Sequence, residues 1–243
     1  MKLDRLFLLT ALTIISINGC NSGKTDSGSS DTKSKYIKKY RDDGTLLSIT
    51  EVNKDNYANG IKVNYYEDGK TVHSKVSYNN GEKEGPALWY YKNGQVFEHT
   101  GFKENQRDGL TRKYYKSGTL MAEFTYERGK VMPGIKEYNE EGELITDYPE
   151  VTIREINRVN SENKIILEVS TSVKNSNTKF YQIGKNDLGW ETRNYLDARD
   201  GSCLMEFHVN PGNTFNKTVE IYAEIPTSLG NVYIAKKSYT INV

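Results

Sequence analysis

The sequence contains few of the residues that build metal centres and disulfide frameworks. Its 243 residues include two cysteines and three histidines, too few for a disulfide scaffold or a protein-made zinc site. The 33 Lys and Arg side chains are balanced by 32 Asp and Glu, so no broad positive field would attract a nucleic acid. The apolar run at residues 6–17 is shorter than the roughly 20 residues that a membrane-spanning helix needs. We therefore expect no metal, no cofactor and no nucleic-acid partner.

Catalytic motifs are also missing from the sequence. It has no Gly-x-Ser-x-Gly elbow, His-Glu-x-x-His pair, phosphate-binding loop or dinucleotide fingerprint. The histidines are scattered along the chain, at His73, His99 and His208. Paired acids such as Asp42-Asp43 belong to turns, whereas a glycosidase needs two carboxylates that face one cleft. The protein is therefore not expected to be an enzyme, and a hydrolase of envelope polymers is the weaker alternative.

The first 19 residues have the features of a secretory signal. Lys2 and Arg5 precede the short apolar run, which is the order found in signal peptides. The run ends in Ile17-Asn18-Gly19-Cys20, which resembles the lipobox of bacterial lipoproteins. The resemblance implies that residues 1–19 are a lipoprotein signal peptide, cleaved before a lipidated Cys20. An ordinary secretory signal followed by a chance cysteine is the alternative.

A polar segment, residues 20–35, follows the signal. Beyond Cys20 its side chains offer nothing more apolar than the methyl group of threonine. Such a segment buries too little apolar surface to offset the entropy of ordering it, so we expect a flexible tether. The residue after Cys20 is Asn21 and not Asp, which at this position would be a signal for the inner membrane. By analogy with lipoprotein sorting, Asn21 favours the outer membrane. The expected location is the cell envelope, with the membrane contacted through the N-terminal lipid.

A repeat of 24 or 25 residues occupies the middle of the chain. Each unit has a glycine preceded by two polar residues, and a tyrosine four positions before that glycine. We call these the turn glycine and the −4 tyrosine. The turn glycines are Gly44, Gly69, Gly94, Gly118 and Gly142, and the −4 tyrosines are Tyr40, Tyr65, Tyr90, Tyr114 and Tyr138. Constant spacing over five units indicates a stacked repeat architecture.

The local pattern in each unit predicts a β-hairpin. Asp-Gly and Asn-Gly pairs are typical of tight turns between antiparallel strands, and apolar residues alternate with period two on either side. The −4 tyrosines share one face with apolar neighbours such as Ile61 and Leu110. Because one hairpin cannot cover that face alone, we expect successive hairpins to stack and cover it.

Segments such as Gly85-x3-Trp89-Tyr90-Tyr91-Lys92-Asn93-Gly94 resemble bacterial MORN-variant repeats. The resemblance covers residues 36–148. It implies a stacked-hairpin fold with a binding or scaffolding role and no catalytic residues. Chains of this kind are often labelled YwqK-family antitoxins, and that label implies a toxin as partner.

One position after each −4 tyrosine lies the −3 residue, which points to the other face of its strand. In the three central units it is aromatic, and Trp89 shares this side, so the candidate binding stripe is Tyr66, Trp89, Tyr91 and Tyr115. Such a stripe could stack on sugar rings or hold an apolar peptide. Polar neighbours such as Thr111 and Lys113 favour a solvent-exposed side. The alternative is that this side is the packed interior of the repeat.

Residues 151–243 lack the repeat and alternate like short strands separated by turn residues. Six or seven strands in about 90 residues predict an immunoglobulin-like β-sandwich. Cys203 lies in an apolar strand pattern and is expected to be a buried structural cysteine. The whole chain is thus expected to be all-β, with stacked hairpins followed by a sandwich.

These features together favour a non-catalytic, lipid-anchored envelope protein whose repeat surface binds a protein or a glycan. An antitoxin or immunity protein that neutralises a toxin is the alternative. The identity of the partner does not follow from the residues.

Overall fold

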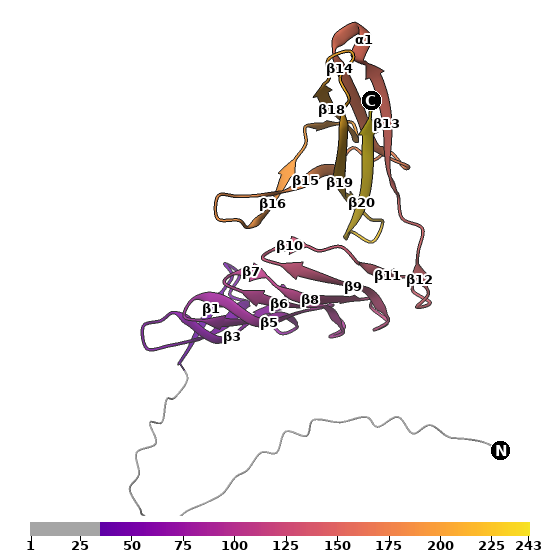
Figure 1. The fold of residues 1–243 in the computed structure, drawn as a ribbon. Helices are drawn as coiled ribbons and strands as arrows, with labels where there is room; N and C mark the ends of the chain where they lie inside the picture. The colour runs from indigo at the N-terminus through magenta and orange to yellow at the C-terminus, as the bar shows by residue number, and fades with distance from the viewer. Residues whose placement is uncertain (1–34) are drawn as a thin grey trace, which may run out of the picture. The chain divides into compact units, whose positions relative to one another are not determined.

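The computed structural model describes residues 35–243. These residues form three antiparallel sheets and one short helix, α1 (Val159–Glu162), so the expected all-β fold class is confirmed (Figure 1). Residues 35–243 contain no helix that is long enough and apolar enough to span a membrane. The expected signal peptide, the lipidated Cys20 and residues 20–34 of the tether lie outside the described residues.

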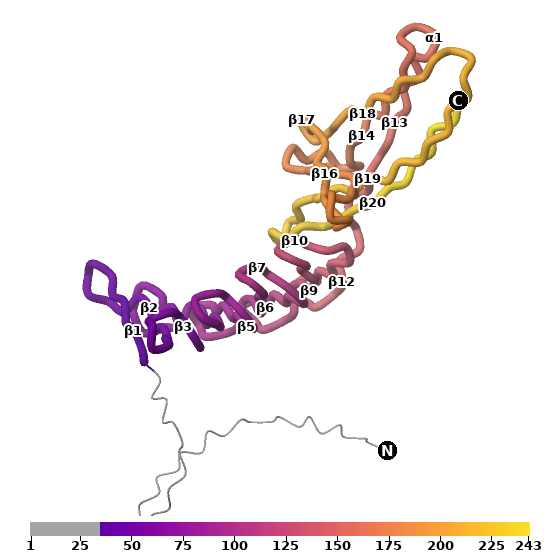
Figure 2. Tube along the Cα trace, turned by 60° about the vertical axis from the view of Figure 1, so that its left-hand side comes forward, coloured from indigo at the N-terminus to yellow at the C-terminus, as the bar shows by residue number. Residues whose placement is uncertain are grey.

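The expected hairpins pair into one twelve-stranded sheet, here called the repeat sheet, in which successive hairpins follow one another in a row (Figure 2). Its main strand order is β1-β2-β3-β4-β5-β6-β8-β9-β11-β12, and the two-residue strands β7 and β10 pair with β6 and β9. The strands are β1 (Lys35–Tyr40), β2 (Leu46–Val52), β3 (Ala58–Tyr65), β4 (Val72–Asn79), β5 (Glu82–Tyr90), β6 (Val96–Lys103), β7 (Gln106–Arg107), β8 (Gly109–Tyr114), β9 (Leu120–Glu127), β10 (Lys130–Val131), β11 (Lys136–Tyr138) and β12 (Leu144–Ile145).

The turns differ in detail from the tight Asp-Gly and Asn-Gly turns expected from the sequence. All five turn glycines have φ values of 65–91°, but the polar residue before each one does not enter the left-handed region. The pairing instead shifts register at the −4 residue, between Trp89 and Tyr90 for example, which marks a β-bulge. The turns with two successive positive φ values are at the opposite ends of the hairpins, as at Asn80-Gly81.

The −4 face of the repeat sheet was expected to be buried, but in the structure it is the opposite face that is buried. On the −4 face, Ile61 is 49% exposed and Leu110 is 43% exposed, so stacking does not cover this face. On the opposite face Ala87 and Thr111 are buried, because larger side chains such as Arg107 lie across that face. This burial contradicts the solvent-exposed interpretation of the stripe side and agrees with the packed-interior alternative.

Residues 151–243 form two four-stranded sheets that we call the sandwich. Their orders are β13-β14-β18-β17 and β16-β15-β19-β20. The strands are β13 (Val151–Arg158), β14 (Lys164–Thr171), β15 (Lys179–Lys185), β16 (Glu191–Tyr195), β17 (Ala198–Arg199), β18 (Ser202–His208), β19 (Asn216–Pro226) and β20 (Val232–Asn242). Both sheets contribute to one apolar core, with Leu167 from one and Ile221 from the other, so the sheets pack face to face.

A buried polar cluster joins the last hairpins of the repeat sheet to the turn between β19 and β20. The Lys113 ammonium donates a hydrogen bond to Asn231 Oδ1 at 2.6 Å. Asn231 Nδ2 and the Thr227 hydroxyl donate to Glu137 Oε1, at 2.6 and 2.7 Å. Glu137 is fully buried, and burial lowers the pKa of Lys113. The repeat sheet and the sandwich therefore contact each other through paired polar groups.

Candidate binding groove on the repeat sheet

The −3 tyrosines connect each repeat to the next. Each phenol hydroxyl donates a hydrogen bond to the backbone carbonyl of the following −4 tyrosine. The oxygen–oxygen distances are 2.5 Å from Tyr66 to Tyr90, 2.8 Å from Tyr91 to Tyr114 and 2.8 Å from Tyr115 to Tyr138. Burial raises the pKa of Tyr91 and of Tyr115, which favours the protonated form that can donate. We call these contacts the inter-repeat latches.

Arginine makes the equivalent contact in the first repeat. The −3 residue there is Arg41, whose guanidinium donates to the carbonyl of Tyr65 at 2.8 Å and to that of Leu46 at 2.9 Å. The last repeat has Asn139 at this position, and the repeat sheet ends one strand later, at β12. The −3 side chain is therefore long and able to donate wherever another repeat follows.

The rings of the −3 tyrosines are also in contact with neighbouring side chains. Lysines of the next repeat lie over them, with Lys92 at 5.5 Å from the Tyr66 centroid and Lys116 at 5.9 Å from that of Tyr91. The Tyr66 ring meets His73 edge to face at 4.8 Å. Hydroxyl and ring contacts together give these tyrosines a structural role, and ligand binding by them stays a prediction.

Two of the four stripe residues line one groove on the buried face of the repeat sheet. This groove, here called the Trp89 groove, has a volume of about 570 Å³ and is bordered by Tyr66 and Trp89 but not by Tyr91 or Tyr115. Its other walls include the polar or charged side chains of Arg41, Asn64, His73, Ser74, Tyr78 and Lys83. Its size falls in the range of sites for small ligands.

Trp89 is held in a fixed position in this groove. Its ring lies 6.3 Å from that of Phe102, and the Arg107 guanidinium lies 5.4 Å from its centroid. Arg107 in turn forms an ion pair with the buried carboxylate of Glu98, the cross-strand neighbour of Trp89. A half-buried indole with its orientation fixed is suited to contact the apolar side of a ligand.

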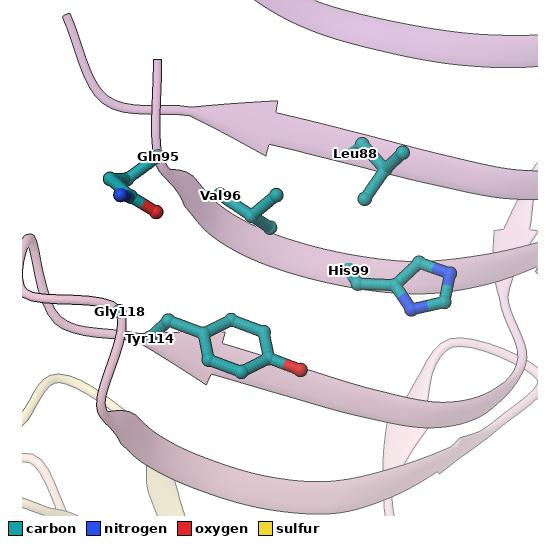
Figure 3. Close-up of a pocket in the computed structure, with 6 residues that line it drawn as sticks. All are labelled: Leu88, Gln95, Val96, His99, Tyr114 and Gly118. Atoms are coloured by element: carbon teal, nitrogen blue, oxygen red, sulfur yellow. The ribbon is translucent and has the colours of Figure 1, made fainter. Parts of the chain in front are cut away.

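A second, smaller pocket lies on the −4 face (Figure 3). It has a volume of about 300 Å³, and its walls are Leu88, Gln95, Val96, His99, Tyr114 and the turn glycine Gly118. Because His73 lines the Trp89 groove and His99 lines this pocket, the two histidines do not share one site.

Sequence reasoning missed the polar wall of the Trp89 groove. Asn64 Nδ2 donates to Ser74 Oγ at 2.9 Å, and these residues are cross-strand partners of β3 and β4. Asn64 could be read from the sequence only as a polar neighbour, because its pairing with Ser74 depends on strand register. Lys83 lies two positions before Gly85, and no local pattern in the sequence marks it as a groove residue.

The cysteine in the sandwich behaves as expected. Cys203 is buried, and burial raises the pKa of its thiol to about 11. Among residues 35–243 no three His, Cys, Asp or Glu side chains gather in a way that could hold a metal ion.

No protein-family model matches the chain, and no curated protein matches it either. The function is therefore argued from the residues and the geometry described above.

Proposed function

We propose that this protein is a non-catalytic binding protein of the cell envelope, attached to the membrane through a lipid on Cys20. It would present the repeat sheet to a protein or glycan partner. The observation that carries the proposal is the Trp89 groove, where a fixed indole lies beside side chains that can donate and accept hydrogen bonds. The lipobox-like sequence supports the anchor.

The MORN-variant and immunoglobulin-like assignments are part of this proposal. The regular succession of hairpins joined by −3 side chains supports the first. For the second, naming β13 to β20 as strands A, B, C, C′, D, E, F and G gives the orders A-B-E-D and C′-C-F-G. These are the orders of immunoglobulin-like sandwiches. Both architectures occur in proteins that bind other molecules or act as spacers.

Photo-cross-linking in intact cells tests the binding role. A benzophenone amino acid would replace Leu47, an exposed residue that borders the Trp89 groove. The matched control would carry it at Leu188, which is exposed in the sandwich. We expect an adduct of defined mass from position 47 and none of that mass from position 188. No adduct from position 47, or the same adduct from both positions, would contradict the proposal.

The anchor has its own test. Radiolabelled palmitate should be incorporated into the wild-type protein and not into Cys20→Ala. The matched control is Cys203→Ala, because it removes the other cysteine of the chain and should leave labelling intact. Labelling that persists in Cys20→Ala would exclude the lipoprotein hypothesis while leaving the groove untouched.

A further inference from the structure

The Trp89 groove has an excess of positive charge. Arg41 and Lys83 border it, and the one acidic residue on its walls is Glu67. The Glu67 carboxylate is largely exposed to solvent and lies 3.5 Å from Lys92, so it does not neutralise the groove. Within residues 35–243 neither Arg41 nor Lys83 has a carboxylate within ion-pairing distance. A ligand that brings its own negative charge would complement this wall.

Arg41 and Lys83 are both held near the groove by contacts that leave their charges unpaired. The Arg41 guanidinium bonds to backbone carbonyls, which fix it without cancelling its charge. The Lys83 ammonium lies 5.1 Å from the centroid of Phe102, the ring that also packs beside Trp89. Lys83 and the indole therefore belong to one connected group of side chains, and Arg41 borders the same groove.

The groove also offers neutral hydrogen-bonding groups. The amide of Asn64 uses one of its protons on Ser74, and its carbonyl oxygen and the Ser74 hydroxyl proton remain available. Burial raises the pKa of Tyr78, so its hydroxyl stays protonated. These groups are of the kind that pair with the hydroxyls of a sugar.

The position of the groove argues against an extended peptide as the ligand. Peptides that bind to sheets commonly add a strand at a free edge, where backbone groups are unpaired. The Trp89 groove lies on a face formed by β2, β3, β4 and β5, which are already hydrogen-bonded to one another. A peptide there would lack backbone pairing, whereas a saccharide depends on side-chain hydrogen bonds and on stacking against an aromatic ring.

We propose that the Trp89 groove binds a carboxylate-bearing saccharide, of the kind formed by uronic acid units. Lys83 and Arg41 would bind its carboxylates, Asn64 and Ser74 the ring hydroxyls, and Trp89 the apolar side of a sugar ring. This inference rests on the proposed function and names the chemistry of the ligand.

The test uses the full chain and a defined probe. In a Trp190→Phe background Trp89 is the only tryptophan, so its fluorescence reports on the groove alone. Trigalacturonic acid would be titrated against this protein, with the carboxyl-reduced neutral trisaccharide as the matched ligand and triglutamate as the peptide control. We expect saturable fluorescence change with the acidic trisaccharide and at least about tenfold weaker binding of the other two.

Two variants test the assigned roles by calorimetry, which needs no tryptophan signal. Lys83→Gln should weaken trigalacturonate binding roughly tenfold, because a charge-assisted hydrogen bond is lost. Lys174→Gln, at an exposed position in the sandwich, should bind like wild type. Trp89→Phe should also bind trigalacturonate more weakly. The melting temperature of Lys83→Gln should equal that of the wild type, so that its weaker binding reports on the groove and not on folding.

The possible outcomes separate this inference from the proposed function. Equal binding of the neutral trisaccharide or of triglutamate, or no effect of Lys83→Gln, would overturn the acidic-saccharide assignment. Absence of trigalacturonate binding together with a specific adduct from position 47 would overturn it and leave the binding role standing. Absence of both would overturn both.

Discussion

The repeat sheet and the sandwich solve the problem of burial in different ways. The sandwich has a continuous apolar core, with Leu167, Phe180 and Ile221 fully buried. The buried face of the repeat sheet mixes apolar residues such as Val76, Ala87 and Phe124 with polar ones, and its buried polar residues are Ser48, Ser74, Glu98, Thr100, Thr111 and Glu137. Two of them, Thr100 and Thr111, share a hydrogen bond of 2.5 Å. Paired polar side chains and ring contacts therefore add to the strand pairing between neighbouring repeats, whereas the two sheets of the sandwich are held by apolar burial.

The difference explains why the groove lies on the repeat sheet. Apolar cores are close-packed, and opening a cavity in one is costly. A face of paired polar side chains can remain partly open to water, because its hydrogen bonds can be made either to neighbours or to solvent. The polar face therefore gives the ligand side chains that are positioned but not enclosed.

The largest expected effect comes from the sandwich core. Phe180→Ala removes a fully buried ring and should lower the free energy of unfolding by about 4 kcal/mol. Urea denaturation measures it, and Leu204→Ala, at an exposed position of β18, is the matched control with a small effect. Similar losses for Phe180→Ala and Leu204→Ala would show that the apolar core does not carry the sandwich.

The buried ion pair of the repeat sheet should come next. Glu98→Gln keeps the shape of the side chain but leaves the Arg107 guanidinium without its carboxylate, at a cost of about 2 kcal/mol. The control is Glu67→Gln, since its ion pair with Lys92 is exposed and should contribute little. Equal effects on urea denaturation would mean that burial does not distinguish the two pairs.

The sandwich should also lose stability at high pH. The buried Cys203 thiol has a pKa of about 11, above its ordinary value of 9.0, so the unfolded chain releases this proton first. Its stabilising contribution is complete below pH 9 and is lost between pH 9 and 11, by about 2 kcal/mol. In Cys203→Ala this part of the pH dependence should disappear from the free energy of unfolding. If the free energy of unfolding of Cys203→Ala falls between pH 9 and 11 as steeply as that of the wild type, Cys203 is not the group responsible.

A single latch should contribute least. Tyr91→Phe removes the hydrogen bond to the Tyr114 carbonyl and should cost about 1 kcal/mol. Tyr57→Phe, at an exposed tyrosine, provides the matched control and should be neutral. If both changes leave the urea midpoint unaltered, the latch contributes nothing measurable.

The repeat could be predicted from the sequence, but not the burial of its faces. The turn glycines mark every hairpin, because each needs a positive φ angle that glycine adopts without strain. Burial of each face depends instead on long side chains of other repeats, such as Arg107, which lie across it and which local alternation does not reveal.

The Trp89 groove was only partly predictable for a related reason. Tyr66 was found because the −3 position is aromatic in the three central repeats, and Trp89 because it shares the side of those residues. Lys83 and Asn64 reach the same groove through cross-strand pairing of different hairpins, which depends on register rather than on local pattern.

The central claim is that the inter-repeat latches hold the repeats together. Amide hydrogen exchange of the triple variant Tyr66→Phe/Tyr91→Phe/Tyr115→Phe tests it most directly. With all three latches removed, amides of β3 to β9 should exchange faster, while those of β14 and β19 in the sandwich keep their wild-type rates. Unchanged exchange in β3 to β9, or an equal increase in the sandwich, would contradict the account.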